Sequence, residues 1–158
     1  MPKRSALGDE IKQTRPFHST AHEAVLGLLR TADIVRRRYV AVVSPAGITP
    51  QQYNVLRILR GAGRRGLPTL EIAERMIENT PGITRLVDRL ETATLVVRER
   101  SEEDRRTVRC RVTRKGLDLL AGLDGAINAA DDAALAMLPE RRQRDLVRIL
   151  DAVRAGSK

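Results

Sequence analysis

Hydroxyl and guanidinium groups lie at close spacing in the middle of this chain, just before an arginine-rich segment. Thr80, Thr84 and Arg85 fall near the start of a predicted helix. Short polar side chains and guanidinium groups at such a place can hydrogen-bond the base edges of duplex DNA in the major groove. Asn79 and Gly82 are expected beside the DNA backbone. An ordinary surface helix with solvated arginines remains the alternative.

The helix that would carry these groups is predicted to begin at Thr80. A threonine hydroxyl can cap a helix, and Pro81 then occupies the first helical position, where a missing N–H costs nothing. Thr84 and Arg85 point outward in this arrangement. Apolar residues recur at the i, i+3, i+4 and i+7 positions of the inward face, namely Ile83, Leu86, Val87 and Leu90.

Two β-like segments follow the helix and enclose polar residues. Residues 95–97 form an apolar run, and residues 108–112 alternate between apolar and polar side chains. The stretch between them is predicted to form the loop of a β-ribbon, or wing. A merely solvated charged hairpin remains the alternative.

The charged residues of this wing are expected to take different parts in a DNA contact. Arg105 or Arg106 would enter the narrow minor groove, whose negative potential attracts arginine, and Asp104 would orient a neighbouring arginine. Arg98 and Arg100 are expected to contact phosphate or to support the wing.

Two more helices are predicted upstream. Residues 49–52 combine a capping box with proline at the first helical position, and a buried side follows before a glycine-rich connection over residues 61–66. This connection is expected to be flexible, since it lacks the GxxxxGK[ST] pattern of a phosphate-binding loop. Only two residues separate the next helix from Thr80, which completes a helix-turn-helix. Its predicted apolar stripe is Leu70, Ala73, Met76 and Ile77.

The order of these motifs resembles the multiple antibiotic resistance regulator (MarR) family of winged-helix transcription factors. The resemblance extends over residues 20–154 or so and is densest in residues 47–56, 70–76, 83–91 and 104–106. It implies a mainly α fold with a small β-wing. In that fold, a winged helix-turn-helix core is flanked by N- and C-terminal dimerisation helices.

Thr94 and Gly82 depart from the expected pattern. Thr94 stands where such proteins usually carry glycine to close the recognition helix with a positive φ. A β-branched residue is strained there, so either the helix ends differently or the turn is strained. Gly82 is unusual inside a helix, where it would allow close approach of the DNA backbone or merely a flexible first turn.

Composition agrees with nucleic acid as the partner. The 158 residues fit one modest domain, and the formal net charge is +9 with a sequence pI of about 10.9. An anionic membrane surface would also suit this charge, but no apolar segment approaches the ~20 residues of a spanning helix. Rings of Phe and Tyr occur at only three positions, too few for base-stacking platforms, so double-stranded DNA is the expected partner.

Residues 1–16 mix charges of both signs, which predicts a disordered, mildly basic arm without a signal-peptide pattern.

Cys110 is the lone cysteine, so no internal disulfide forms, and a cytoplasmic location is expected. Because Cys110 alternates with Val108 and Val112, we interpret it as a small buried hydrophobe rather than a redox sensor.

Three apolar stripes flank the predicted DNA-binding region of residues 47–113, one in residues 17–46 and two in residues 114–158. We expect these flanking segments to be dimerisation helices, because a small winged-helix core cannot cover all three stripes, and a homodimer would bind an inverted repeat. An intrachain bundle is the alternative. The stripes are Val25, Leu28, Ala32, Val35, Tyr39 and Val42; Leu120, Leu123, Ile127, Ala130, Ala134 and Met137; and Leu146, Val147, Leu150 and Val153.

No catalytic constellation or cofactor motif is recognisable, so an enzyme is not expected. The GxSxG, HExxH and paired CxxC patterns are missing. His18 and His22, at i and i+4, could share a helical face and bind a metal ion, but no third ligand is evident. Exposed or pocket-lining histidines are the favoured interpretation.

The resemblance also implies a repressor that releases DNA when a small molecule binds between the dimerisation helices and the winged domain. Many relatives bind aromatic acids or phenolic compounds there, and core or interface packing is the alternative role for each tyrosine. A non-specific architectural DNA-binding protein and a helical protein-interaction module remain alternative functions. The possible effector contacts are His18, His22, Arg30, Tyr39 and Tyr53.

Overall fold

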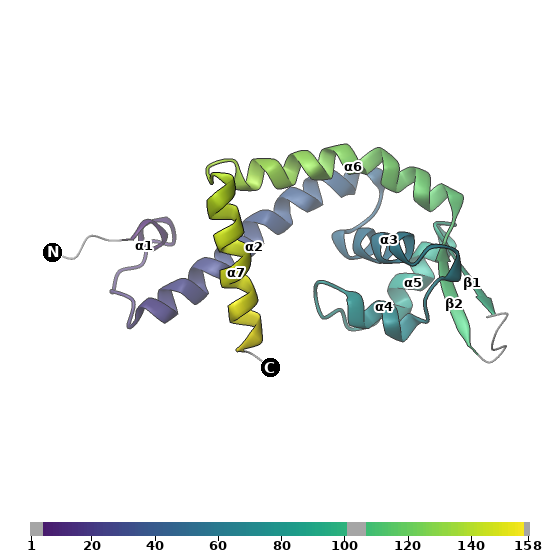
Figure 1. Cartoon of the computed structure of the whole chain (residues 1–158), viewed down its shortest axis with the longest axis horizontal. Helices are drawn as coiled ribbons and strands as arrows, with labels where there is room; N and C mark the ends of the chain where they lie inside the picture. Colours follow the sequence, from purple (N-terminus) through teal and green to yellow (C-terminus); the bar gives the residue numbers. More distant parts are fainter. Residues whose placement is uncertain (1–4, 101–106, 157–158) are drawn as a thin grey trace. The chain divides into compact units, whose positions relative to one another are not determined.

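The computed structural model describes residues 5–100 and 107–156, and its chain divides into two compact units, Met1–Arg38 and Tyr39–Lys158. Figure 1 shows helices and an antiparallel pair of strands, which confirms the mainly α fold with a small wing. The elements of the described part are α1 (Ala6–Glu10), α2 (Thr20–Val43), η1 (Ser44–Ala46), α3 (Pro50–Ala62), η2 (Gly63–Arg65), α4 (Thr69–Arg75), α5 (Ile83–Thr92), β1 (Val96–Arg100), β2 (Val108–Val112), α6 (Arg114–Leu135) and α7 (Glu140–Ala155).

Helix α1 lies within the segment that the sequence predicts to be disordered, so that prediction is wrong for these residues. The Ser5 hydroxyl caps α1 by accepting a hydrogen bond from the Gly8 N–H at 3.2 Å. Glu10 pairs with Arg30 of α2 at 2.8 Å. A helix this short would be marginal in isolation, and these two contacts hold it in place.

Helix α3 begins as predicted. The Thr49 Oγ1 accepts the Gln52 N–H at 3.2 Å, and the Gln52 Oε1 accepts the Thr49 N–H at 2.9 Å, so the capping box is confirmed. Val55, Leu56 and Leu59 form the buried side of the helix and are fully buried. This helix is therefore fixed both at its start and along one face.

The connection over residues 61–66 is more ordered than predicted. Helix α3 continues to Ala62, and η2 is closed by a hydrogen bond from the Gly66 N–H to the Gly63 carbonyl oxygen at 3.3 Å. The prediction of a flexible connection is wrong, because backbone hydrogen bonds hold these residues in place.

Helix α4 is shorter than its predicted apolar stripe. It ends at Arg75, and the Ile77 N–H instead donates to the Asn54 Oδ1 at 3.0 Å. Leu70 and Ile77 are 77% and 80% exposed, whereas Ile72 is fully buried. The predicted inward face is wrong at its two ends, since a side-chain acceptor on α3 ends the helix before Ile77.

The wing is a two-stranded antiparallel sheet, with Val96 opposite Val112 and Arg100 opposite Val108. Both predicted strands are confirmed, but β1 reaches Arg100, which places more of the basic segment on the strand than predicted. On the other edge of β2, Leu67 and Cys110 exchange two backbone hydrogen bonds of 3.0 and 2.8 Å.

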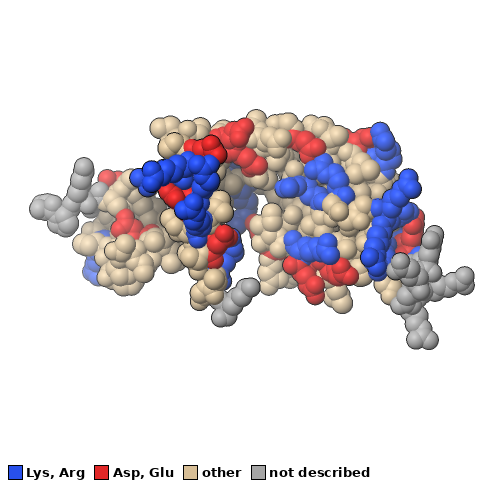
Figure 2. Space-filling model, viewed as in Figure 1, with Lys and Arg blue, Asp and Glu red and all other residues tan. Residues whose placement is uncertain are grey.

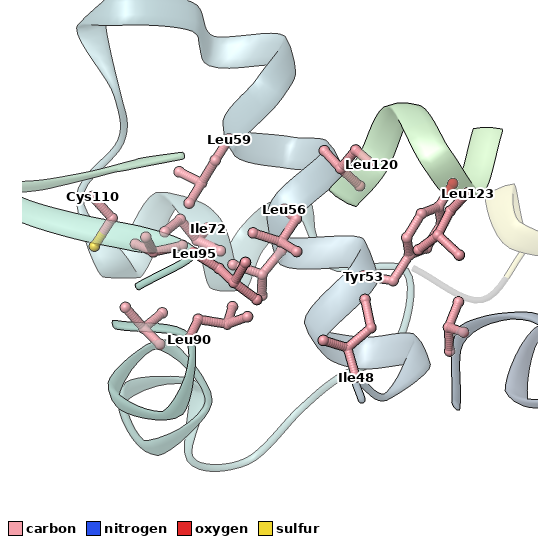
Figure 3. Close-up of a cluster of buried hydrophobic side chains, with 14 of the residues drawn as sticks. Ile48, Tyr53, Leu56, Leu59, Ile72, Leu90, Leu95, Cys110, Leu120 and Leu123 are labelled. Carbon is pink, nitrogen blue, oxygen red and sulfur yellow. The ribbon is translucent and has the colours of Figure 1, made fainter. Parts of the chain in front are cut away.

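The core of the second unit gathers side chains from every helix between α3 and α6 (Figure 3). Its members include fully buried Leu56 and Leu59 of α3, Ile72 of α4, Leu90 of α5 and Leu120 of α6. Each fully buried leucine or isoleucine contributes about 1.5–3 kcal/mol of hydrophobic free energy. This core fixes α5 and the wing against α3 and α6.

Helices α2 and α7 leave parts of their predicted stripes on the surface. Val25 and Leu28 of α2 are 55% and 42% exposed, and Val147 and Val153 of α7 are 58% and 50% exposed.

In the α6 stripe, by contrast, Leu120, Leu123 and Ile127 are buried within the chain, so the prediction that the core cannot cover them is wrong.

Within residues 5–100 and 107–156, no helix has the length and apolarity needed to cross a membrane.

Candidate DNA-binding surface

The exposed face of α5 is the centre of the candidate surface. Val87 and Leu90 are fully buried, which confirms the predicted inward face. Thr84 and Arg85 are exposed on the opposite side. In the described part of the chain, Arg85 has no ion-pair or hydrogen-bond partner, so its donors are available to a ligand such as a base edge.

The start of α5 differs from its prediction. The N-cap is Gly82, whose φ of 81° lies in the left-handed region that glycine tolerates. The Thr80 hydroxyl is not the cap but donates to the Glu78 carbonyl oxygen at 3.0 Å, and Pro81 lies in the turn. The prediction of Thr80 as N-cap is therefore wrong, because the sharp backbone reversal falls at the glycine.

The loop before α5 is held to α3 by two side chains. Asn54 accepts the Ile77 N–H, and the Gln51 Nε2 donates to the Glu78 Oε2 at 3.3 Å. Asn79 follows directly and is exposed. The loop that presents Asn79 and Thr80 is thus fixed relative to the core.

Arg98 joins the wing to α5. Its guanidinium contacts Asp88 and Glu91 of α5, each at 2.6 Å, and its backbone N–H donates to the Glu91 carboxylate at 3.2 Å. Burial acts to lower the pKa of Arg98, but the hydrogen bonds to Asp88 and Glu91 outweigh it and raise the pKa. Of the two roles expected for Arg98, these contacts favour wing support over phosphate contact.

Asp88 and Glu91 are positioning residues that the sequence interpretation missed. They are three residues apart on α5, so they share a face, and that spacing is the available signal. What the sequence could not supply is the register that brings Arg98 opposite them. Arg100 lies exposed at the end of β1, whereas Asp104, Arg105 and Arg106 lie outside the described residues.

The end of α5 settles the alternatives for Thr94. Its φ is 60°, so the turn is the strained one. The Lys115 ammonium donates to the Ala93 carbonyl oxygen at 2.9 Å and to the Thr94 Oγ1 at 3.0 Å, and the Thr113 hydroxyl donates to the Thr94 carbonyl oxygen at 2.8 Å. These bonds from the start of α6 hold Thr94 in a conformation that costs about 1–3 kcal/mol.

Cys110 is fully buried on β2, and its Sγ lies 3.7 Å from the Thr69 Oγ1. Its prediction as a small buried hydrophobe is confirmed.

In the residues that the structure describes, no group of three or more His, Cys, Asp or Glu side chains could hold a metal ion.

The possible effector contacts of the first unit already contact one another. The rings of His18 and His22 lie 4.3 Å apart, and Phe17 meets His22 edge-on at 5.8 Å. The Arg30 guanidinium is paired with Glu10. An anionic ligand of Arg30 would therefore compete with an existing carboxylate.

The two tyrosines of the second unit occupy different settings. The Tyr39 hydroxyl donates to the Asp131 carboxylate at 2.6 Å, and burial followed by this hydrogen bond raises the pKa of Tyr39 to about 12. Tyr53 is 3% exposed, and burial raises its pKa against the opposing charge of Arg57. The Arg57 guanidinium carbon lies 5.9 Å from the centroid of the Tyr53 ring.

Arg57 is a candidate residue for binding a carboxylate ligand, and the sequence interpretation missed it. It is exposed and has no ion-pair partner in residues 39–100 and 107–156. Its position four residues after Tyr53 on the same helix was the available signal.

The sequence model of the MarR family matches residues 48–108, the span from the start of α3 to the wing. The crystal structure of a MarR transcription factor from Planctomyces limnophilus is 36% identical and covers 87% of this chain and 99% of its own, with a TM-score of 0.65. The chain belongs to the MarR family. As a MarR protein, it is a DNA-binding transcriptional regulator and not an enzyme.

Other MarR relatives agree with this assignment. The HTH-type transcriptional repressor Rv2887 of Mycobacterium tuberculosis is 29% identical over 133 residues, covering 83% of this chain and 94% of the repressor. The structure of Rv2887 in complex with p-aminosalicylic acid covers 80% of this chain and 94% of its own, at 27% identity and a TM-score of 0.62. A MepR–DNA complex from S. aureus, 17% identical with a TM-score of 0.72, covers 90% of this chain and 99% of its own and shares the fold.

Proposed function

We propose that this chain is a sequence-specific repressor that binds an inverted-repeat operator as a homodimer in the cytoplasm. The observation that carries the proposal is Arg85 on the exposed face of α5, which has no partner among the described residues and lies on the helix that Arg98 joins to the wing. A rigid helix with free donors suits base readout in the major groove.

The homodimer is supported by the exposed apolar residues of α2 and α7. Side chains such as Val25, Leu28, Val147 and Val153 are 42–58% exposed in the single chain. Two copies that cover these stripes would form a two-fold dimer with a matching pair of α5 helices. Such a dimer binds half-sites about one helical turn apart.

The residues divide into readout, backbone and wing groups. Thr80, Thr84 and Arg85 contact base edges, and Asn79 and Gly82 lie beside the DNA backbone. The wing contributes Arg100 to phosphate and Arg105 or Arg106 to the minor groove, with Asp104 orienting an arginine and Arg98 supporting the strand.

The effector proposed for this regulator is an aromatic acid or a phenolic compound. The support is the Rv2887 relative, whose structures include complexes with salicylic acid and p-aminosalicylic acid. Within the second unit, Tyr39 provides a half-buried ring, and Arg57 provides a guanidinium with no ion-pair partner among the described residues. Tyr53 is buried beside Arg57, so it contributes only after a rearrangement exposes its ring. Arg30, His18 and His22 contribute only after the Glu10 pair and the stacked rings rearrange.

Selection from a random duplex library at near-physiological salt tests the proposal. Purified protein should enrich an inverted repeat against excess competitor DNA. Binding without an enriched motif would identify an architectural protein, and the absence of binding would identify a protein-interaction module. Added salicylate should then release the selected duplex, and Arg57→Ala should weaken that response more than Arg141→Ala on α7.

A further inference from the structure

The η2 turn presents two arginines in a rigid setting. Arg64 and Arg65 are exposed between Gly63 and Gly66, whose φ values are 62° and 60° with ψ of −147° and −174°. This region of backbone conformation is close to glycine-only. The backbone of the turn is therefore fixed, and both side chains are exposed on it.

The same turn is attached to the wing. Leu67 exchanges two backbone hydrogen bonds with Cys110 of β2, and the Arg109 Nη1 donates to the Gly66 carbonyl oxygen at 3.4 Å. A Cβ at Gly66 would lie 2.5 Å from the Cys110 carbonyl oxygen, so the two backbones are in close contact. Arg64 and Arg65 consequently keep a fixed position beside the edge of β2 that faces away from β1.

Positive charge is concentrated on this part of the second unit. Figure 2 shows Lys and Arg side chains at the end of the second unit where Figure 1 draws β1, β2 and the adjoining end of α6. Glu99 of β1 is paired with Arg111 of β2 at 2.5 Å. Among the described residues, Arg64 has no ion-pair partner.

We propose that Arg64 and Arg65 bind DNA phosphates outside the half-site that α5 and the wing contact. This inference rests on the proposed function, since the wing must lie on DNA for η2 to reach the backbone. The turn is joined to the wing through β2, and guanidinium groups carried on a fixed backbone suit phosphate oxygens. The turn thereby lengthens the footprint of each protomer without reading sequence.

The test compares Arg64→Ala/Arg65→Ala with Arg141→Ala/Arg142→Ala, which removes the same charge from exposed positions on α7. Each protein is titrated with the selected duplex, cut at the half-site ends or extended by about ten base pairs on each side. Wild type and the α7 variant should bind the extended duplex more tightly. The η2 variant should lose that gain, and its salt dependence should fall by about 0.9 in log–log slope for each phosphate contact removed.

Equal flank gains and equal salt slopes for the two alanine pairs would overturn the inference, since net charge alone would then explain the effect. Arg64→Lys/Arg65→Lys should retain most of the slope, and unchanged melting temperatures exclude misfolding. A failure of the proposed function gives a different result. If wild type selects no site but the η2 pair alone lowers the slope on random duplex, the phosphate surface stands and sequence-specific regulation falls.

Discussion

The apolar stripes of this chain differ in how far the chain itself buries them. Leu56, Leu90 and Leu120 lie in the second unit and are fully covered by neighbouring elements of the same chain. On α2 and α7, residues of equally regular stripes, such as Leu28 and Val147, are 42% and 58% exposed. The same helical periodicity therefore occurs in helices that build the core and in helices with an exposed apolar face, and only the burial of the side chains distinguishes the two cases.

This difference indicates how the protein is assembled. The winged-helix region has its own core and presents α5 on it, so one chain suffices to build the candidate DNA-binding surface. Exposed apolar side chains in regular array mark an interaction surface. The proposed homodimer supplies the cover that a single chain does not.

The largest expected effect is in the covered core. Leu56→Ala should lower the free energy of unfolding by about 2–5 kcal/mol, because it removes fully buried atoms and leaves a cavity. Leu70→Ala, the same substitution at a 77% exposed position, should change it by less than about 0.5 kcal/mol. Urea unfolding measures both, and similar losses would contradict the assignment of the core.

The uncovered stripe should respond in assembly rather than in folding of the core. Val147→Asp should weaken dimerisation by about 2 kcal/mol or more, because a carboxylate would be buried without a partner. Arg148→Ala is the matched control, since it changes the net charge equally at an exposed neighbour. Sedimentation over a concentration series measures both, and an unaffected dimer in Val147→Asp would place the interface elsewhere.

Two arginines of the DNA-binding region sharpen the comparison further. Arg98→Ala should lower the free energy of unfolding by about 1 kcal/mol, because Asp88 and Glu91 lose their partner but remain partly solvated. Arg85→Ala should leave stability unchanged and reduce discrimination between operator and mismatched duplex by about 1–3 kcal/mol. Competition binding measures this discrimination, and an unchanged value would remove Arg85 from the readout group.

Arg100→Ala should weaken binding to all duplexes to a similar degree.

The smallest expected effect is at the strained turn. Thr94→Gly should raise the free energy of unfolding by about 0.5–1 kcal/mol, because glycine accepts the φ of 60° without the β-branched clash. Thr94→Asn should act in the same direction. Calorimetry can resolve the change, and a loss of stability would show that the bond from Lys115 to the Thr94 hydroxyl outweighs the strain.

Local chemistry made much of the fold predictable. The capping box at Thr49 and the inward residues Val87 and Leu90 follow from short-range hydrogen bonding and from helical periodicity. The second strand likewise follows from its alternation, and the first follows from its apolar run. These features depend on residues a few positions apart, so the sequence contains the whole interaction.

The remaining features depend on partners distant in sequence. Asn54 ends α4 across 23 residues, and the β2 pairing of Leu67 orders a glycine-rich connection that looks flexible. Arg98 could be given two roles from the sequence, and only the register of β1 against α5 favours one of them. The start of α5 was predicted at Thr80, but Gly82 is a second candidate for the N-cap. The helix begins after Gly82, because the backbone reverses there with a positive φ.

The molar mass of the wild-type protein in solution tests the central claim most directly. Sedimentation equilibrium should give twice the 17.6 kDa of the single chain at micromolar concentration, because a second copy covers the stripes of α2 and α7. A mass of 17.6 kDa that persists as concentration rises would contradict the homodimer and the inverted-repeat operator derived from it.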